Sequence, residues 1–530
     1  MEKRYEVYMN SDAMRREERS KEKLYVHHVY QQIETIVPRM VTPDPKFDLD
    51  PREGQDEMQV RALQRKIDYD LEVDGFVNKQ VDFAKTALIC GVTVGKVIWD
   101  RRVSNVKVHD YSVKPMDLLG GAPATKVVER VDRNGPSCIP VNLWDFFPYP
   151  GCATIDEMPE VFHRVWLSDD EVRARMELVG EDGKPVYKNL NKVLAGSGMT
   201  DESRQLPNES PEDATARRGE DRHEFIERWR NGRLTVIADR QHLVRDCHNP
   251  YWHGRKPFVG ASTQPDIRSF VGISEVEVIE NIARMIHKFE NLRLRAAEFA
   301  VNPVLKIARG LKGSKKLEWR PGAHLYLDRP DQIQAETAPA NLGAAWDEVQ
   351  AYLGYMQQVS GVSPFIAGAD PGASGVNQET ATGASILQAE ANKRLALKLL
   401  QMQIMYSQVA KMFVQLNQQF MTKPELVRVA GAEGNEWVQV DPKDIAGAYD
   451  VRASNSTESL AKNAEVERIS RAIETLMPMH GVPLADGTVV DIKYPLKSLL
   501  DAIGVDANQC FAQAPPPPPM MGDMGGQPPA

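Results

Sequence analysis

The fold is decided by one continuous amphipathic stretch, residues 272–303, which read GISEVEVIENIARMIHKFENLRLRAAEFAVNP. Apolar residues recur three and four positions apart, which predicts one helix face packed against the protein (Val276, Ile279, Ile282, Ile286, Phe289 and Leu292). Polar residues occupy the other face (Arg284, His287, Lys288, Asn291 and Arg295). Because Ser274 is a good helix start and Asn302-Pro303 a stop, we expect ~27 helical residues, which would span ~40 Å.

Two further long helices are predicted after this stretch. The first runs from about Leu342 to Val359, and the second from about Thr380 to Phe420. The second has an apolar seam and polar or alanine-rich other faces; the seam is Leu395, Leu399, Met402, Met405, Val409, Met412, Leu416 and Phe420. A Gly/Pro/Ser-rich loop, GVSPFIAGADPGASGVNQ, lies between these helices. The segment before Ala340 carries two strand-like pieces, VLKIA and AHLYLD.

The N-terminal half mixes helices with strands, and the fold class is therefore α+β. Helices are expected from Lys21 to Pro38 and from Gln59 to Thr86, and antiparallel strands between Gly91 and Val141. Asn231-Gly232 predicts a tight hairpin turn. Toward the C-terminus we expect a hairpin at LVRVAGAEGNEWVQV, a helix from Lys462 to Met477 and a short one near residues 497–503. Polar residues 199–222 predict a mobile insertion.

Composition is that of an ordinary soluble protein. The 530 residues carry 65 basic and 74 acidic side chains, for a net charge of −9, so the whole chain is not built to adhere to polyanions. Five cysteines without a CxxC pair favour reduced thiols over a disulfide framework. The N-terminus lacks the apolar core of a signal peptide, and the longest apolar stretch, Ala87 to Trp99, is too short for a membrane helix.

Motifs for catalysis are missing from the sequence. GxSxG, HExxH and a complete phosphate-binding GxxxxGK[ST] loop do not occur. The densest set of metal-ligating residue types has no standard zinc spacing and favours a packed loop (His242, Cys247, His248 and His253). Asp145, Asp169 and Asp170 are the carboxylates a nuclease would need, but Ser168 followed by Asp169-Asp170-Glu171 is typical of a helix start. We therefore predict no catalytic residue, no cofactor and no metal.

A basic band is the one unusual charge feature. From Asn281 to Arg320 the chain has three acidic residues and ten basic ones (Arg284, Lys288, Arg293, Arg295, Lys306, Arg309, Lys312, Lys315, Lys316 and Arg320), a net +7. Such a band can meet phosphate or an acidic protein partner. A solvated helix face that pairs with acidic neighbours in an assembly is an equally good interpretation.

The order of these elements resembles the portal proteins, or head-to-tail connectors, of tailed bacteriophages. The resemblance rests on residues 272–303, on a second helix ending in VSGVSP, and on a long helix introduced by QETATGASILQAEANKRL. Two more stretches are similar to the family: NLWDFFPYPGCATIDEMPEVFHRVWLSDDEV to its wing domain, and SNSTESLAKNAEVERISRAIETLMPM with DAIGVDANQ to its crown. The resemblance covers most of residues 20–510 and lies in loosely patterned motifs. The insertion and the Pro/Met-rich tail fall outside it.

The resemblance implies a division of the chain into the parts of a portal subunit. These parts are a wing (1–273), a first stem helix (274–300), a clip (301–341), a second stem helix (342–362), a tunnel loop (363–379), a long helix with a return to the wing (380–455), a crown (456–510) and a disordered Pro/Met-rich tail (511–530).

By the same resemblance, the protein is expected to be a structural protein and not an enzyme. It would form a ring, usually of twelve subunits, at one capsid vertex of the virion, after assembly in the host cytoplasm and with no role for a membrane. Double-stranded DNA would pass through it without sequence specificity during packaging and ejection. The other implied partners are the terminase large subunit, a tail or adaptor protein, and the major capsid and scaffolding proteins.

Site residues follow from the same positions. The DNA-facing tunnel loop would present Gly372, Ser374, Asn377 and Gln378; the clip would dock partners through Lys306, Arg309, Lys312, Lys315 and Lys316; the stem would carry Arg284, Lys288 and Arg295. Two alternatives stay open. One is a metal-dependent DNA-processing hydrolase that uses the His/Cys loop. The other is a non-viral scaffold or adaptor protein whose polyproline tail binds partner domains.

Overall fold

The computed structural model describes residues 1–9, 24–42, 45, 47–51, 57–109, 125–180, 183–196, 222–301, 304–307, 333–336, 342–362, 381–431, 434–447 and 449–453, with six single positions between 469 and 499. The chain divides into two units, Met1–Ala453 and Ser454–Ala530. The predicted crown helix, the insertion, the tunnel loop and most of the clip lie outside the described residues. No helix among the described residues is long and apolar enough to cross a membrane.

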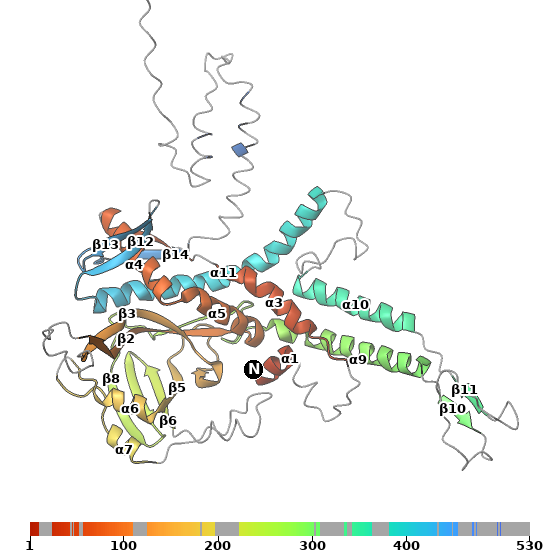
Figure 1. Ribbon diagram of the computed structural model, residues 1–530, viewed down its shortest axis with the longest axis horizontal. Helices are drawn as coiled ribbons and strands as arrows, with labels where there is room; N and C mark the ends of the chain where they lie inside the picture. The colour runs from red at the N-terminus through yellow and green to blue at the C-terminus, as the bar shows by residue number, and fades with distance from the viewer. Residues whose placement is uncertain are drawn as a thin grey trace, which may run out of the picture. The chain divides into compact units, whose positions relative to one another are not determined.

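The first unit mixes helices with antiparallel sheets, which confirms the α+β prediction (Figure 1). Its helices are α1 (Glu2–Tyr8), α3 (His28–Met40), α4 (Glu57–Val73), α5 (Phe76–Cys90), α6 (Asp169–Met176), α7 (Leu190–Leu194), α9 (Glu275–Val301), α10 (Leu342–Ser360) and α11 (Ala381–Phe420). A short 3-10 turn covers Leu143–Asp145.

Strands within the described residues form five separate sheets. One has five strands in the order β4-β5-β6-β7-β8 (Phe146–Pro148, Glu160–Ser168, Arg222–Arg230, Arg233–Ala238, His242–His248), and one has three in the order β3-β2-β9 (Thr125–Pro140, Thr93–His109, Phe258–Ala261). Three are two-stranded: β1-β14 (Phe47–Pro51, Tyr449–Ala453), β10-β11 (Val304–Ile307, Ile333–Glu336) and β12-β13 (Glu425–Gly431, Gly434–Val440).

The sequence predictions for the long helices are accurate to a residue or two. The helices α9, α10 and α11 fall where the apolar periods placed them, and α9 has the expected 27 residues. The hairpin between β6 and β7 turns at Asn231 and Gly232, whose φ angles of 47° and 67° are left-handed. Ser168 and Glu171 form a capping box at the start of α6.

Two predictions of helix bounds need correction. Helix α3 begins at His28 and not at Lys21, because residues 24–27 are not helical and Leu24 hydrogen-bonds to Asn291 of α9 instead. The stretch 59–86 is two helices, broken at Gly75, whose φ of +61° a side chain disfavours. The strand-like piece VLKIA is confirmed as β10, which pairs with residues 333–336, and AHLYLD at 323–328 lies outside the described residues.

The helix α11 is the centre of the core. Its predicted seam is largely buried, with the exceptions of Leu399 and Phe420, which are half-buried. It contacts α3, α4, β2, β3, β9 and β14, so elements from both ends of the unit meet on it. Tyr406 packs edge-on against Phe76 of α5, with 5.4 Å between the ring centroids. Trp99 of β2 stacks on Phe420 at 5.2 Å.

Buried charges join the elements around α11. Glu227 of β6 accepts a hydrogen bond from Lys96 of β2 at 2.7 Å, which links the two larger sheets. Burial alone would raise the pKa of Glu227, but the ammonium of Lys96 and the imidazole of His163 hold it far below its usual range. Because a depressed carboxyl pKa adds stability that is present above its unfolded value of about 4.3, this link is lost only in strong acid.

Asp74 ties the α4–α5 turn to β3. Its carboxylate is buried and accepts hydrogen bonds from Lys79 Nζ at 2.7 Å, Ser137 Oγ at 2.7 Å and the backbone N–H of Cys138 at 3.1 Å, as well as from Arg133. A buried charge with this many donors is costly to replace, because the donors would stay buried without an anion.

We therefore expect Asp74→Asn to destabilise the protein by about 3 kcal/mol. The measurement is urea-induced unfolding followed by circular dichroism at low protein concentration. Asp170→Asn is the control, since Asp170 is exposed and pairs with Arg173 on the surface, where the loss should be below about 0.5 kcal/mol. Equal unfolding midpoints for the two variants would contradict this role of Asp74.

Candidate assembly surface

The helices α9 and α10 pack side by side and extend from the rest of the unit (Figure 1). Buried residues of both helices line the contact, among them Ile286 of α9 and Val349 and Met356 of α10. The rings of Phe289 and Tyr352 stack with 5.7 Å between centroids. At the far end of the pair, the strands β10 and β11 close the connection. The two helices therefore form one antiparallel hairpin.

Polar contacts hold the base of this hairpin. Ser274 Oγ accepts a hydrogen bond from the backbone N–H of Val276 at 3.1 Å and donates to the carbonyl of Ile89 at 2.6 Å, so it caps α9 and ties it to α5. Glu275 forms an ion pair with Lys398 of α11, and both side chains are buried. Gln264 donates to the same carboxylate. A buried charge persists only when it is paired, so the start of α9 is fixed on α11.

A second set of contacts joins the N-terminal segment to α9. Asn291 uses its side-chain oxygen to accept from the backbone N–H of Leu24 at 3.0 Å, and its amide nitrogen to donate to the carbonyl of Leu24 at 3.1 Å. Four residues on, the imidazole of His28 lies 3.6 Å from the carboxylate of Glu290 and 6.0 Å, centroid to centroid, from the ring of His287. Residues 24–28 therefore lie along α9, and we call them the docked segment.

Burial controls the charge of this cluster. It lowers the pKa of His28 and of His287, and the nearby charge of His28 lowers that of His287 further. Burial raises the pKa of Glu290 against the opposing effects of His287 and Arg293. His28 Nε2, His287 Nδ1 and Glu290 Oε2 are buried and form no hydrogen bond. At neutral pH both imidazoles are therefore neutral.

The predicted basic residues of α9 are on its surface. Arg284, Lys288 and Arg295 are exposed at helical spacing, and Arg284 pairs with Glu280 one turn earlier. Arg293 instead lies over the ring of Trp346 on α10 at 4.7 Å. The prediction that Leu292 belongs to the packed face is wrong: its side chain is exposed beside Lys288 and Arg295, because Asn291 occupies the position against the docked segment.

Of the remaining predicted site residues, the structure describes Lys306 alone. Lys306 lies on β10 opposite Gln334 in the register. The other four clip residues and all four tunnel-loop residues lie outside the described residues (Arg309, Lys312, Lys315 and Lys316; Gly372, Ser374, Asn377 and Gln378).

An apolar stripe on α11 is the feature that sequence reasoning missed. Leu397, Leu400 and Ile404 follow one another at helical spacing and are 61%, 45% and 47% exposed, although α11 is otherwise packed into the core. The helical spacing of these three residues can be read from the sequence. The longer apolar seam on the adjacent face of the helix has the same spacing, so the stripe was not recognised as a separate surface.

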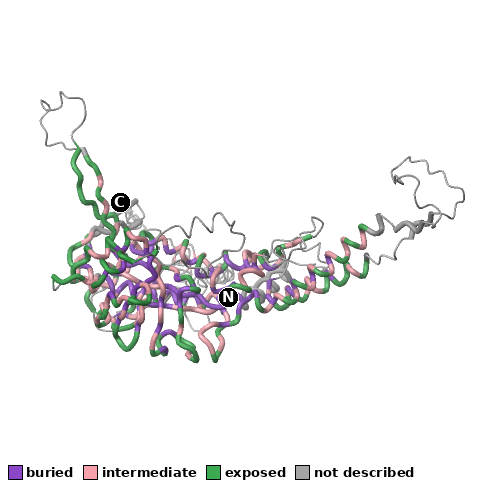
Figure 2. Tube along the Cα trace, turned by 90° about the horizontal axis from the view of Figure 1, so that it is seen from below, coloured by how far each residue is buried: buried purple, intermediate pink, exposed green. Residues whose placement is uncertain are grey.

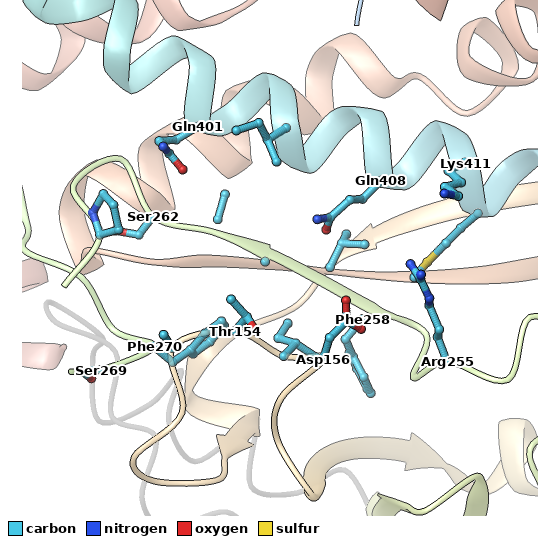
Figure 3. Close-up of a pocket in the computed structure, with 18 of the residues that line it drawn as sticks. Thr154, Asp156, Arg255, Phe258, Ser262, Ser269, Phe270, Gln401, Gln408 and Lys411 are labelled. Atoms are coloured by element: carbon cyan, nitrogen blue, oxygen red, sulfur yellow. The ribbon is translucent and has the colours of Figure 1, made fainter. Parts of the chain in front are cut away.

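The stripe continues into a groove of about 250 Å³ (Figure 3). Gln401, Gln408 and Lys411 line it from α11, while Asp156 and Phe270 line it from the loops opposite. Because Ile404 also lines the groove, apolar stripe and groove form one continuous surface, open to a further chain.

The residues proposed for catalysis do not converge. Cys247 and His248 are neighbours on β8 and point to opposite faces of the sheet, and the ring of His253 stacks on Tyr251 at 5.3 Å in the following loop. Asp145 accepts a hydrogen bond from Arg164 at 2.9 Å, and Asp169 pairs with His223 at 3.2 Å. Among the described residues no group of three His, Cys, Asp or Glu side chains is arranged to hold a metal.

The described part of the molecule projects a pair of long helices and has no group of side chains arranged to hold a metal. A comparison with known protein families agrees with these features. The family model described as phage SU10 portal protein matches residues 2–522, nearly the entire chain. The chain belongs to this family. It is therefore a bacteriophage portal protein, a structural component of a capsid-associated ring assembly and not an enzyme. A comparison with curated proteins gave no match.

In this portal protein, docking of residues 24–28 on α9 should depend on pH. An imidazole whose pKa is lower in the folded than in the unfolded state adds stability that is complete above about pH 6.5 and decreases as the pH falls below it. Glu290 acts in the opposite sense, because its raised pKa favours the protonated carboxyl in the folded state as the pH falls, and it therefore offsets part of the effect of the two imidazoles. We expect amide exchange at residues 24–28 to become several-fold less protected between pH 7.5 and pH 5.5.

Hydrogen exchange read by mass spectrometry, corrected for intrinsic rates, measures this change. His28→Gln with His287→Gln should give equal protection at both pH values. His242→Gln, on the edge strand β8 of the five-stranded sheet, is the control and should keep the pH dependence. Undiminished protection of the unaltered protein at pH 5.5 would show that the cluster does not titrate as stated.

Proposed function

We propose that the protein forms the ring at one capsid vertex through which double-stranded DNA enters the head during packaging and leaves it during ejection. The observation that carries the proposal is the match of the portal family to residues 2–522. The α9–α10 hairpin supports it, because a pair of long helices anchored at one end is a suitable wall element for a channel built from many copies.

The parts of the subunit are proposed as follows. Residues 274–300 and 342–362 are the stem, 301–341 the clip, 363–379 the tunnel loop, 380–455 the long helix with its return to the wing, and 456–510 the crown, with residues 1–273 as the wing and 511–530 as a tail. The clip docks the terminase large subunit and later the tail or adaptor proteins, through Lys306, Arg309, Lys312, Lys315 and Lys316. Major capsid and scaffolding proteins surround the ring.

Electrostatics favour transport over tight binding of DNA. A charge of −9 per subunit gives the ring a repulsive average toward phosphate. The exposed Arg284, Lys288 and Arg295 moderate that repulsion locally. In the tunnel loop, Gly372, Ser374, Asn377 and Gln378 offer small and polar contacts, which position a backbone but do not read bases. The average negative charge of the ring and the polar tunnel loop together favour passage of DNA without sequence specificity.

Subunits contact one another through the apolar stripe of α11 in this proposal. Leu397, Leu400 and Ile404 are exposed among the described residues and would gain burial from a second copy, and the groove beside Ile404 is able to receive a side chain from it. When two different faces of identical subunits contact each other, each subunit is rotated relative to the previous one. The subunits close into a ring if that rotation is a whole-number fraction of a full turn.

Negative-stain imaging of the purified protein tests the ring directly, and we expect rings with a central hole. Leu400→Glu with Ile404→Glu should abolish most rings and leave folded monomers, because two charges would be buried at each contact. Leu178→Glu with Val179→Glu is the matched control and should leave rings intact, because both side chains are exposed and lie outside the stripe and the groove. Compact monomers of the unaltered protein under all conditions, including with capsid protein present, would refute the proposed function.

Deletion of residues 367–376 tests the tunnel loop. Rings and heads should still assemble, because the deletion leaves α10 and α11 complete, but packaging or retention of DNA should fall strongly. The measurement is the amount of nuclease-protected DNA per purified head. Heads filled to the wild-type level would remove the loop from the DNA path while leaving the ring itself unaffected.

A further inference from the structure

The strands β2 and β3 continue well beyond the sheet to which they belong. The strand β9 pairs with β2 over Thr93–Lys96, whereas β2 and β3 pair with each other as far as His109 and Thr125. Figure 2 shows the two strands leaving the body as an exposed arm. We call residues 101–109 and 125–132 the ribbon. Arg133 fixes its base through Asp74 and the carbonyl of Pro136, so the ribbon is held at one end.

Valines occupy both faces of the ribbon. Directly paired residues share a face, so Val103 and Val131 lie on one side together with Val127, which is opposite Lys107. The side that alternates with it carries Val106, Val128 and Val108. Val127 and Val131 are 61% and 52% exposed, and none of the six valines is buried.

A ribbon of this kind is unfavourable in an isolated subunit. Two strands without a third strand or a packed face are marginally stable in water. Exposed valines along an unpaired edge are also an aggregation hazard, which proteins ordinarily avoid with charges or a covering element. Among the described residues, no element packs over the ribbon. The valines therefore indicate a protein surface that covers them.

The charge of the ribbon indicates which protein surface covers its valines. The ribbon carries five basic residues and two acidic ones (Arg101, Arg102, Lys107, Lys126 and Arg130 against Glu129 and Asp132), a net +3 within a chain of −9. The rest of the chain therefore carries −12, which is −9 less +3. A second copy of this chain presents a surface of opposite average charge. Phosphate would attract the same cations, but it offers nothing to pack against valines on both faces.

We propose that the ribbon of each subunit packs on the neighbouring copy in the ring. The inference rests on the proposed ring, and it adds an interface on the wing side to that of α11. In a closed ring every subunit has a neighbour on each side, so every ribbon finds its surface and none is left exposed. Burial of the valines then supplies association energy that the isolated subunit lacks.

Photo-crosslinking tests the contact in the otherwise unaltered full-length protein. Benzoylphenylalanine replaces Val127 in one variant and Val179 in another; both valines are 61% exposed, but Val179 lies outside the ribbon in the β5–β6 connection. We expect rings in both cases, and a covalent adduct of two copies from position 127 alone. An adduct within one chain, which leaves its mass unchanged, would overturn the proposal. An adduct with DNA or another capsid protein in purified heads would do the same.

Assembly gives a second, independent measurement. Val103→Ser, Val127→Ser and Val131→Ser together should raise the protein concentration at half-assembly by about tenfold, as expected for lost burial of small apolar side chains. Val179→Ser should leave it unchanged, and circular dichroism establishes that both variants fold. If rings form with no adduct and no shift in concentration, the ribbon inference alone fails. If the unaltered protein forms no rings, the proposed function fails with it.

Discussion

The burial of one face of α11 is the constraint on which the rest of the first unit depends. Met402, Met405, Val409 and Leu416 are almost completely inaccessible, and six other elements meet on this helix. Burying such a side chain contributes about 1.5–3 kcal/mol relative to exposure, so the seam outweighs any single surface contact. The helix cannot rotate without exposing the seam. Its orientation therefore decides which residues remain on the outside.

Buried polar pairs convert this packing into defined positions. An apolar seam allows small sliding movements, whereas Lys398 meets Glu275 at the start of α9, and Asn417, completely buried, donates to Asp70 of α4 at 2.7 Å. Each pair leaves a buried charge or polar atom unsatisfied if the helices shift, which is far more costly than a lost methyl contact. The hairpin α9–α10 and the N-terminal helices are thus placed relative to α11 by electrostatics as well as by shape.

Periodicity predicted the helices because it reflects local geometry, and it failed where distant residues compete. The bounds of α9 and α11 follow from apolar spacing, and the turn at Asn231-Gly232 follows from backbone sterics. The start of α3 does not, because Leu24 hydrogen-bonds to Asn291, 267 positions away, and local periodicity does not reveal such a partner. The candidate site shows the same division. The exposed arginines and lysine of α9 were predictable from their helix face. The burial of Lys398 was not, because its partner Glu275 lies 123 positions away and no local pattern indicates it.

Exposed apolar residues have a different meaning in this molecule from buried ones. Single exposed leucines or valines are common on soluble proteins and need no explanation. Here they are ordered: three lie on one stripe of the most deeply packed helix, and six line both faces of one projecting ribbon. An isolated subunit gains nothing from either arrangement, since both cost hydration and neither packs on another described element of the same unit. The core of this chain is well packed, yet ordered apolar residues remain exposed on its surface. Such a surface is typical of a subunit that is completed by assembly, in agreement with its membership of the portal family.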